Sequence, residues 1–231
     1  MVLYETRQNG INHELGTSGF LYRSNKLMYD RKTSSMWSTL HGEPVIGPLV
    51  GKGITLKRRS VVTTTWGEWS QLHPGTSVLS LNTGYRRNYG EGVAYESYFS
   101  TDRLMFETPK SDTRLPNKRQ VVALRSHDKT NPVAIDTQFL KKNPVYSVKV
   151  GADHVVILTT PQGASRVYQA KNHKFISLND QGEVIDQHGE RWKISESELI
   201  HSSQEALVRY PSHQSFWFGW VAQFPKTRLI K

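Results

Sequence analysis

The chain contains no cysteine. Disulfide bonds, thiolate metal sites and a cysteine nucleophile are therefore excluded within its residues. The absence leaves the compartment open, because cysteine-free chains suit reducing and oxidising surroundings alike. An apolar run of about 18 residues, the length with which a helix spans a membrane, is also absent. The first residues, MVLYETRQNG, lack a basic leader followed by an apolar stretch, so we expect a strand there rather than a signal peptide.

Motifs that mark common enzyme and cofactor sites are absent too. No two of the nine histidines stand at HxH, HxxxH or HExxH spacing, so no linear zinc site is predicted. The glycine-rich stretch at 42–53 matches neither GxGxxG nor a loop ending in GK[ST], and no GxSxG elbow occurs. We therefore expect no metal and no evident cofactor, and the sequence assigns no catalytic residue.

The composition is that of a folded, β-rich protein. The 231 residues suffice for one large domain or for two smaller ones that share a core. Thr, Ser, Val and Gly are frequent and long runs of Ala, Leu and Glu are rare, which favours a mostly β fold of the α+β class. The net charge of +10 is scattered, without a run of five basic residues, and this pattern disfavours nucleic-acid binding.

The most informative feature that is present is an internal repeat. Six residues recur at a constant spacing, and a weaker similarity between residues 20–37 and 175–192 extends the repeat toward the N-terminus. We expect two copies of an antiparallel sheet, each with one short tryptophan-bearing helix packed against it. The first copy spans 1–82 and lacks its opening strands, an insert rich in Tyr and Arg spans 83–119, and the second copy spans 120–231, all in one compact unit. Six residues recur 151 positions later without a gap: Leu56, Arg58, Trp66, Trp69, Pro74 and Thr76 return as Leu207, Arg209, Trp217, Trp220, Pro225 and Thr227.

Local patterns place the helices at 66–72 and 217–224. A threonine of the Thr63–Thr65 run should cap the first helix, and Ser212 or Ser215 the second. In each helix the tryptophans share one face, and their recurrence in both copies favours a buried, core-anchoring role over ligand stacking. Turn and alternation patterns predict the remaining strands at 54–58, 77–81, 104–106 and 228–230, and hairpins at 120–135 and 146–159, the first of which turns at 127–131.

Several segments together resemble one family. They include SGFLYRSNKLMYDRKTSSMWS at 18–38, TTWGEWSQLHPGTSVLS at 64–80, RLPNKR at 114–119 and SFWFGWVAQFPKTRLI at 215–230. The chain is similar over nearly its whole length to the family catalogued as domain of unknown function 3179. The resemblance implies a prokaryotic, largely uncharacterised protein whose full-length relatives are often exported. Typical members have more chain ahead of the Met1 equivalent, with two cysteines, so we expect this chain to be a shortened or divergent member to which no cysteine role carries over.

Two groups of residues are candidates for ligand binding. Arg31 follows a predicted strand and can donate charge-assisted hydrogen bonds to an anionic or sugar-like molecule. Its neighbour Asp30 recurs as Asp186, which favours a structural role for the aspartate as a turn-closing acceptor. The second group belongs to the insert, where Tyr and Arg cluster on a glycine-containing loop suited to phosphate, carboxylate or sugar. Its members are Tyr85, Arg86, Tyr89, Tyr95, Asp102 and Arg103.

Three functions remain open from the sequence. The first is a non-catalytic ligand-binding or structural module whose contact surface is the Tyr/Arg loop. The second is an enzyme whose site combines loops of both copies with an N-terminal segment that this chain lacks. The third is nucleic-acid binding through the basic surface. The partner predicted for the first is a small anionic or sugar-like molecule, and the oligomeric state and the compartment stay undetermined.

Overall fold

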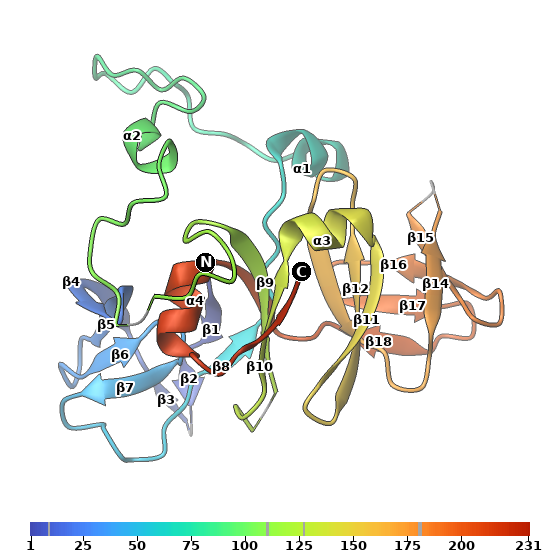
Figure 1. Cartoon of the computed structure of the whole chain (residues 1–231), viewed down its shortest axis with the longest axis horizontal. Coiled ribbons are helices and arrows are strands. Elements are labelled where there is room, and N and C mark those ends of the chain that lie inside the picture. Colours follow the sequence, from blue (N-terminus) through green and yellow to red (C-terminus); the bar gives the residue numbers. More distant parts are fainter. Residues whose placement is uncertain (9, 110, 127, 180–181) are drawn as a thin grey trace.

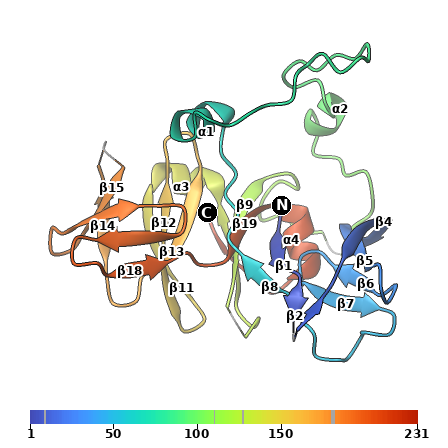
Figure 2. The same cartoon turned by 180° about the vertical axis from the view of Figure 1, so that it is seen from behind.

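A computed structural model of the chain describes residues 1–8, 10–109, 111–126, 128–179 and 182–231. Within them the structure is mostly β, with few short helices and several antiparallel sheets, as the composition predicts. Figures 1 and 2 show a sheet at each end of the long axis, with further sheets between them. None of the helices among these residues has the length and apolar character to cross a bilayer.

The N-terminal end of the molecule is a four-stranded antiparallel sheet. Its strands follow one another in chain order through short turns, as alternating apolar residues and polar turns predict. They are β4 (Leu15–Tyr22), β5 (Asn25–Asp30), β6 (Met36–Ser38) and β7 (Glu43–Ile46). Two small ladders lie beside it, β1 (Leu3–Glu5) with β8 (Lys57–Arg59) and β2 (Arg7–Gln8) with β3 (Ile11–Asn12).

A mixed sheet occupies the middle of the chain's fold. Its strands lie in the order β19 (Ser212–Phe216), β9 (Gln120–Arg125), β10 (Pro132–Asp136) and β20 (Arg228–Ile230). Only β10 and β20 run parallel within it. Because side chains alternate across a strand, β9 sends Val122 and Leu124 into one apolar cluster and Val121 and Ala123 into another. The sheet is therefore covered on both faces.

Helices and a second sheet pack against the two faces of this central sheet. On one face, α3 (Thr137–Lys142) packs with β11 (Val145–Val150), β12 (Asp153–Thr159) and β13 (Ser165–Gln169). On the other face lies α4 (Trp217–Gln223), whose Trp217 and Trp220 are completely buried. The far end of the molecule is a five-stranded antiparallel sheet made by β14 (Phe175–Leu178), β15 (Glu183–Asp186), β16 (Arg191–Ile194), β17 (Glu198–His201) and β18 (Ala206–Val208).

The two tryptophan-bearing helices have different surroundings. The first helix, α1 (Trp66–Leu72), begins where the sequence predicts, with Thr65 accepting a hydrogen bond from the Glu68 N–H at 3.2 Å. It has no buried residue, and Trp66 and Trp69 are 54% and 37% exposed. The prediction that these two indoles anchor a core is therefore wrong. No strand pairing forms at 60–65 or 77–81, and α1 borders an open pocket that it shares with Leu158, Arg166 and Ile194 instead of packing closely as α4 does.

Three further predictions need correction. The strands predicted at 77–81 and 104–106 are absent, because these residues make no ladder with a neighbour. Neither Ser212 nor Ser215 caps α4, whose N-cap is Phe216 without a side-chain hydrogen bond. The carbonyls of Arg119 and Asn117 accept from the first helical N–H groups instead, at 2.8 and 3.0 Å. The hairpins at 120–135 and 146–159 are confirmed, although His127 of the first turn lies outside the described residues.

A long excursion leaves the body of the protein between α1 and the central sheet. Both views show the chain after α1 extending away and returning through the short helix α2 (Glu96–Phe99). Its apolar side chains are largely exposed, including Leu79 at 94% and Tyr85 at 73%. The Tyr/Arg-rich residues therefore lie on a peripheral loop.

Candidate anion-binding site

A cavity of about 850 Å³ lies between the middle of the molecule and its C-terminal sheet. Strand β8 and the residues after it form one wall, the end of β18 another, and the turn before β17 a third. Two hydrogen bonds tie the first wall to the chain after β18. Ser60 Oγ donates to the Tyr210 carbonyl at 2.7 Å, and the Val61 N–H donates to the Ser212 carbonyl at 2.9 Å.

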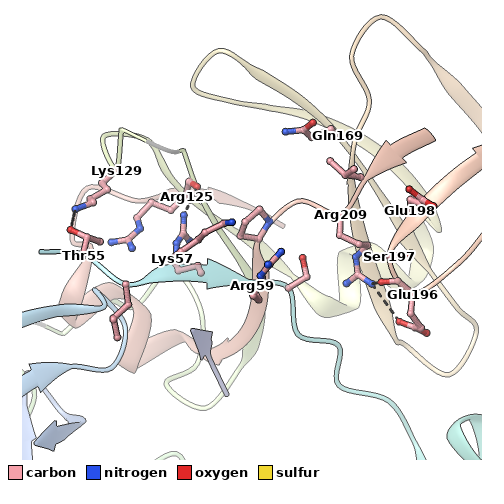
Figure 3. A pocket seen from close by; sticks show the side chains of 15 residues that line it. Thr55, Lys57, Arg59, Arg125, Lys129, Gln169, Glu196, Ser197, Glu198 and Arg209 are labelled. Atoms are coloured by element: carbon pink, nitrogen blue, oxygen red, sulfur yellow. Dashed lines mark hydrogen bonds and ion pairs between the residues drawn. The ribbon is translucent and has the colours of Figure 1, made fainter. Parts of the chain in front are cut away.

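Basic side chains predominate in this cavity, which Figure 3 shows. Two carboxylates, those of Glu196 and Glu198, line it as well. From here on we call this cavity the basic pocket. Its cationic residues are Lys57, Arg58, Arg59, Arg125, Lys129 and Arg209.

Among the described residues, four of these six cations have carboxylate partners within 4.0 Å and two do not. Lys57 and Arg59 pair with Glu5 on β1, Lys129 pairs with Glu43, and Arg209 lies 3.4 Å from Glu196. Among the described residues, no carboxylate lies within 4.0 Å of Arg58 or Arg125. The basic pocket therefore contains two positive charges that the surrounding protein leaves without a direct counter-charge.

Arg125 is a buried cation at the back of the pocket. It is 2% exposed, and its guanidinium lies 5.1 Å from the centre of the Phe224 ring. Nη2 donates to the His41 carbonyl at 3.2 Å, whereas Nε and Nη1 have no acceptor in the structure. Burial, with a contribution from the charge of Arg58, lowers its pKa to about 10. The group still carries its charge at neutral pH.

Arg58 is the partly exposed member of the pair. It lies in the middle of β8, opposite Tyr4 of β1. Its Nη2 donates to the Arg125 carbonyl at 2.9 Å, and burial lowers its pKa. That bond leaves most of its donors without a partner among the described residues. A planar guanidinium with free donors is the group best suited to bind carboxylate or phosphate through two hydrogen bonds.

The model for the family described as "Protein of unknown function (DUF3179)" matches residues 1–227. The chain belongs to the DUF3179 family. No curated protein and no solved structure matches it. The matched residues of this DUF3179 chain include every residue that lines the basic pocket.

Next to the two arginines, the DUF3179 chain buries a histidine without a partner for one ring nitrogen. His213 on β19 is 4% exposed and its Nε2 has no hydrogen bond in the structure. Burial lowers its pKa to about 3, and the charges of the Met1 ammonium, Arg58 and Arg125 act in the same direction. His213 is therefore neutral at pH 7 and adds no further positive charge to this region.

We expect this histidine to make the protein less stable in acid. Its pKa is about 3 in the folded chain and about 6.5 when unfolded. As the pH falls below 6.5, only the unfolded chain takes up the proton, so stability falls toward pH 3. Between pH 7 and pH 5 the loss should be about 2 kcal/mol from this residue. Urea unfolding at both pH values should show a smaller decline in His213→Gln, and an equal decline would contradict a buried neutral His213.

The structure separates Arg31 from the basic pocket. Arg31 follows β5 in the N-terminal sheet and forms an ion pair with Glu14 at 2.9 Å. Its guanidinium also lies 5.4 Å from the centre of the Tyr29 ring. The structural role predicted for Asp30 is confirmed, because its Oδ1 accepts from the N–H groups of Lys32 and Thr33 at 2.8 and 3.2 Å.

The predicted residues of the Tyr/Arg loop lie on the excursion. Tyr85 and Arg86 are exposed, and Tyr89 shares a hydrogen bond of 2.8 Å with the Thr83 hydroxyl. Arg87 lies 5.8 Å from the centre of the Tyr85 ring. These contacts hold the loop locally and place none of its residues in the basic pocket.

The remaining predicted residues fasten the return of the excursion. Tyr95 has a φ of 60° at the N-cap of α2 and lines an apolar hollow of about 320 Å³ with the returning part of the excursion, the β4–β5 hairpin and Phe218 of α4. Asp102 accepts from the N–H groups of Asn117 and Lys118 at 3.1 and 3.2 Å. Arg103 is exposed. Asp102 thus connects the returning part of the excursion to the loop that precedes β9.

The residues that form the basic pocket went unrecognised as a site in the sequence. Arg58 and Arg209 stood out only as repeat positions. The one available indication of a site was Arg125, which ends the strand QVVALR after four consecutive apolar residues. Charged residues are almost never fully buried unless they are paired, so an arginine in such a strand indicates a special environment.

Proposed function

We propose that this DUF3179 protein is a non-catalytic binding module for a small anion, which binds in the basic pocket. The observation that best supports this is the pair Arg58 and Arg125: both line the pocket with four other cations, and neither has a carboxylate partner among the described residues. Arg58 makes the direct contact, and Arg125 raises the local positive potential from behind it.

An anion in the pocket would compensate the unpaired positive charge. A buried charge without a partner is costly, because water is removed from it and nothing replaces the lost solvation. An anion at Arg58 would supply the missing counter-charge and accept from its free guanidinium donors. Hydrogen bonds between ionised groups are roughly twice as strong as neutral ones. The pocket volume also falls within the range typical of small-molecule sites, about 300–1,000 Å³.

The Tyr/Arg loop is the alternative contact surface for the ligand. Its exposed aromatic rings and the arginine beside Tyr85 support that role. The loop and the basic pocket make different predictions for mutants, so one experiment can separate them.

The test is a titration of the whole chain with inorganic phosphate by isothermal calorimetry. Arg58→Gln should weaken binding at least tenfold, as expected for the loss of about 1.5–3 kcal/mol per hydrogen bond to a charged group. Arg86→Gln on the excursion is the matched control and should leave affinity unchanged. The converse pattern would move the site to the loop, and no binding by the unmodified chain would reject the proposal. A DNA oligonucleotide that binds tightly despite Arg58→Gln would favour the nucleic-acid alternative.

We also propose that the chain contains two copies of one unit. The first copy spans 1–82 and the second spans 120–231, with the Tyr/Arg-rich insert at 83–119 between them. Equivalent contacts support this. Trp69 Nε1 donates to the Thr76 hydroxyl at 2.9 Å, and 151 positions later Trp220 Nε1 donates to Thr227 at 2.9 Å. Arg58 lies opposite Tyr4 as Arg209 lies opposite Tyr168.

The same proposal places the basic pocket between the two copies. Val61 hydrogen-bonds to Ser212, the residue 151 positions further on. In a duplicated protein a residue touches its own equivalent where an approximate twofold axis passes. The pocket walls lie next to this contact, with Arg58 on one side and its equivalent Arg209 on the other. The different surroundings of α1 and α4 mark where the two copies have diverged.

A further inference from the structure

The two ends of the basic pocket differ in charge. Figure 3 shows Lys57, Arg125 and Lys129 together on one side, and Arg209 with the carboxylates of Glu196 and Glu198 on the other. The first end includes the two unpaired guanidiniums, whereas the second has two carboxylates beside one arginine. A ligand that fills the pocket therefore meets a cationic end and an end rich in acceptors.

Glu196 is held as an anion at the second end. Burial opposes its ionisation, but hydrogen bonds from Arg166 and the charges of Arg166 and Arg209 outweigh this and lower its pKa. Arg166 donates to Glu196 Oε1 through Nε at 3.0 Å and Nη2 at 2.6 Å. Arg209 Nη1 lies 3.4 Å from the other oxygen. This carboxylate is already paired, mainly with Arg166 and more weakly with Arg209.

Glu198 is the free acceptor of the pocket. It begins β17, where its backbone is paired with Val208 of β18, and its side chain is partly buried. No lysine, arginine or histidine among the described residues lies within 4.0 Å of its carboxylate. Ser197 and Gln169 line the same end and add neutral hydrogen-bonding groups. Carboxylate, amide and hydroxyl groups together are suited to the hydroxyls of a polyol.

A second anionic group would be repelled by Glu198, and a single phosphate ion would leave most of the cavity unfilled. We propose that the ligand is a phosphorylated or carboxylated sugar or polyol, with its anionic group at Arg58 and its hydroxyls at Glu198. This inference rests on the proposed function and names the ligand class of the same pocket. Glu196 is paired with Arg166 and Arg209, whereas Glu198 has no cationic partner among the described residues, so this end favours neutral hydroxyl donors over a second anionic group.

The experiment compares three probes on the whole chain by calorimetry: inorganic phosphate, glucose 6-phosphate and glucose. Glucose 6-phosphate should bind at least tenfold more tightly than phosphate, because its hydroxyls reach Glu198. Glu198→Gln should weaken the binding of glucose 6-phosphate about five- to tenfold and leave the affinity for phosphate unchanged. Glu91→Gln on the excursion is the matched control and should change neither. Arg58→Gln should weaken the binding of both phosphate and glucose 6-phosphate. If Arg58→Gln fails to fold, Lys57→Gln, at an exposed position, should weaken the binding of both probes as well.

The outcomes separate the two proposals. Equal affinity for phosphate and glucose 6-phosphate, or tighter binding of glucose 6-phosphate by Glu198→Gln, would overturn the inference while the anion site stands. No binding of either phosphate by the unmodified chain would overturn both. Binding of glucose as tight as that of glucose 6-phosphate would show that the cationic end makes no contact with the ligand.

Discussion

Replacing Trp220 with alanine is expected to lower the free energy of unfolding by about 3–5 kcal/mol. The indole is completely buried in α4, packs 4.3 Å from the Phe224 ring centre and donates to Thr227 at 2.9 Å. Removing it opens a large cavity against the central sheet and leaves the Thr227 hydroxyl without this partner. Urea unfolding followed by circular dichroism measures the change.

The matched variant is Trp69→Ala, at the equivalent position of α1. Its indole makes the corresponding hydrogen bond to Thr76 but is 37% exposed. We expect a loss of about 1 kcal/mol or less, because no core closes over it. Equal losses at the two positions would mean that α1 packs against a sheet as α4 does. A loss below about 1 kcal/mol for Trp220→Ala would contradict the central core described here.

The comparison of α1 and α4 also shows what the sequence could predict. Both helices begin where their patterns place them, because spacing of aromatic residues and a following Pro act locally. The hairpins of β9 with β10 and of β11 with β12 follow from alternation and turn composition for the same reason. Whether a helix face is buried depends on which strands lie under it, and that is a long-range property. The recurrence of tryptophan at 66 and 69 gave no information on it.

The residues of the basic pocket could not be predicted from the sequence for a related reason. The basic pocket joins residues from positions 55 to 211, and no spacing rule relates Arg58, Arg125 and Glu198 along the chain. The Tyr/Arg loop looked like a site because its residues are close in sequence, which is the only closeness a sequence displays. Ion pairs also depend on the fold: Lys57 and Arg59 share the carboxylate of Glu5, whereas Arg58 between them has no carboxylate partner among the described residues.

Replacing Asp30 with alanine should lower the free energy of unfolding by about 3 kcal/mol, since each buried donor left unpaired costs about 1–3 kcal/mol. Asp30 is 1% exposed, and its Oδ2 lies 2.7 Å from Nδ1 of the buried His13. Its other oxygen accepts from two backbone N–H groups of the turn after β5. His13 in turn packs 5.1 Å from the centre of the buried Trp37 ring, so the loss reaches the core of the N-terminal sheet.

The pH dependence distinguishes this carboxylate from a simple packing residue. Burial alone would raise the pKa of Asp30, but the hydrogen bonds from His13, Lys32 and Thr33 outweigh it and lower the pKa. A lowered folded pKa gives stability that is complete above the unfolded pKa of about 3.9 and is lost as the pH falls through the folded pKa. The difference between the unmodified chain and Asp30→Ala should therefore be constant from pH 7 to pH 5 and shrink below pH 4. Asp186→Ala, which removes the acceptor of Trp192 Nε1 at 3.1 Å, should behave in the same way. A difference that persists unchanged below pH 3 would mean that the aspartate contributes through its volume rather than its charge.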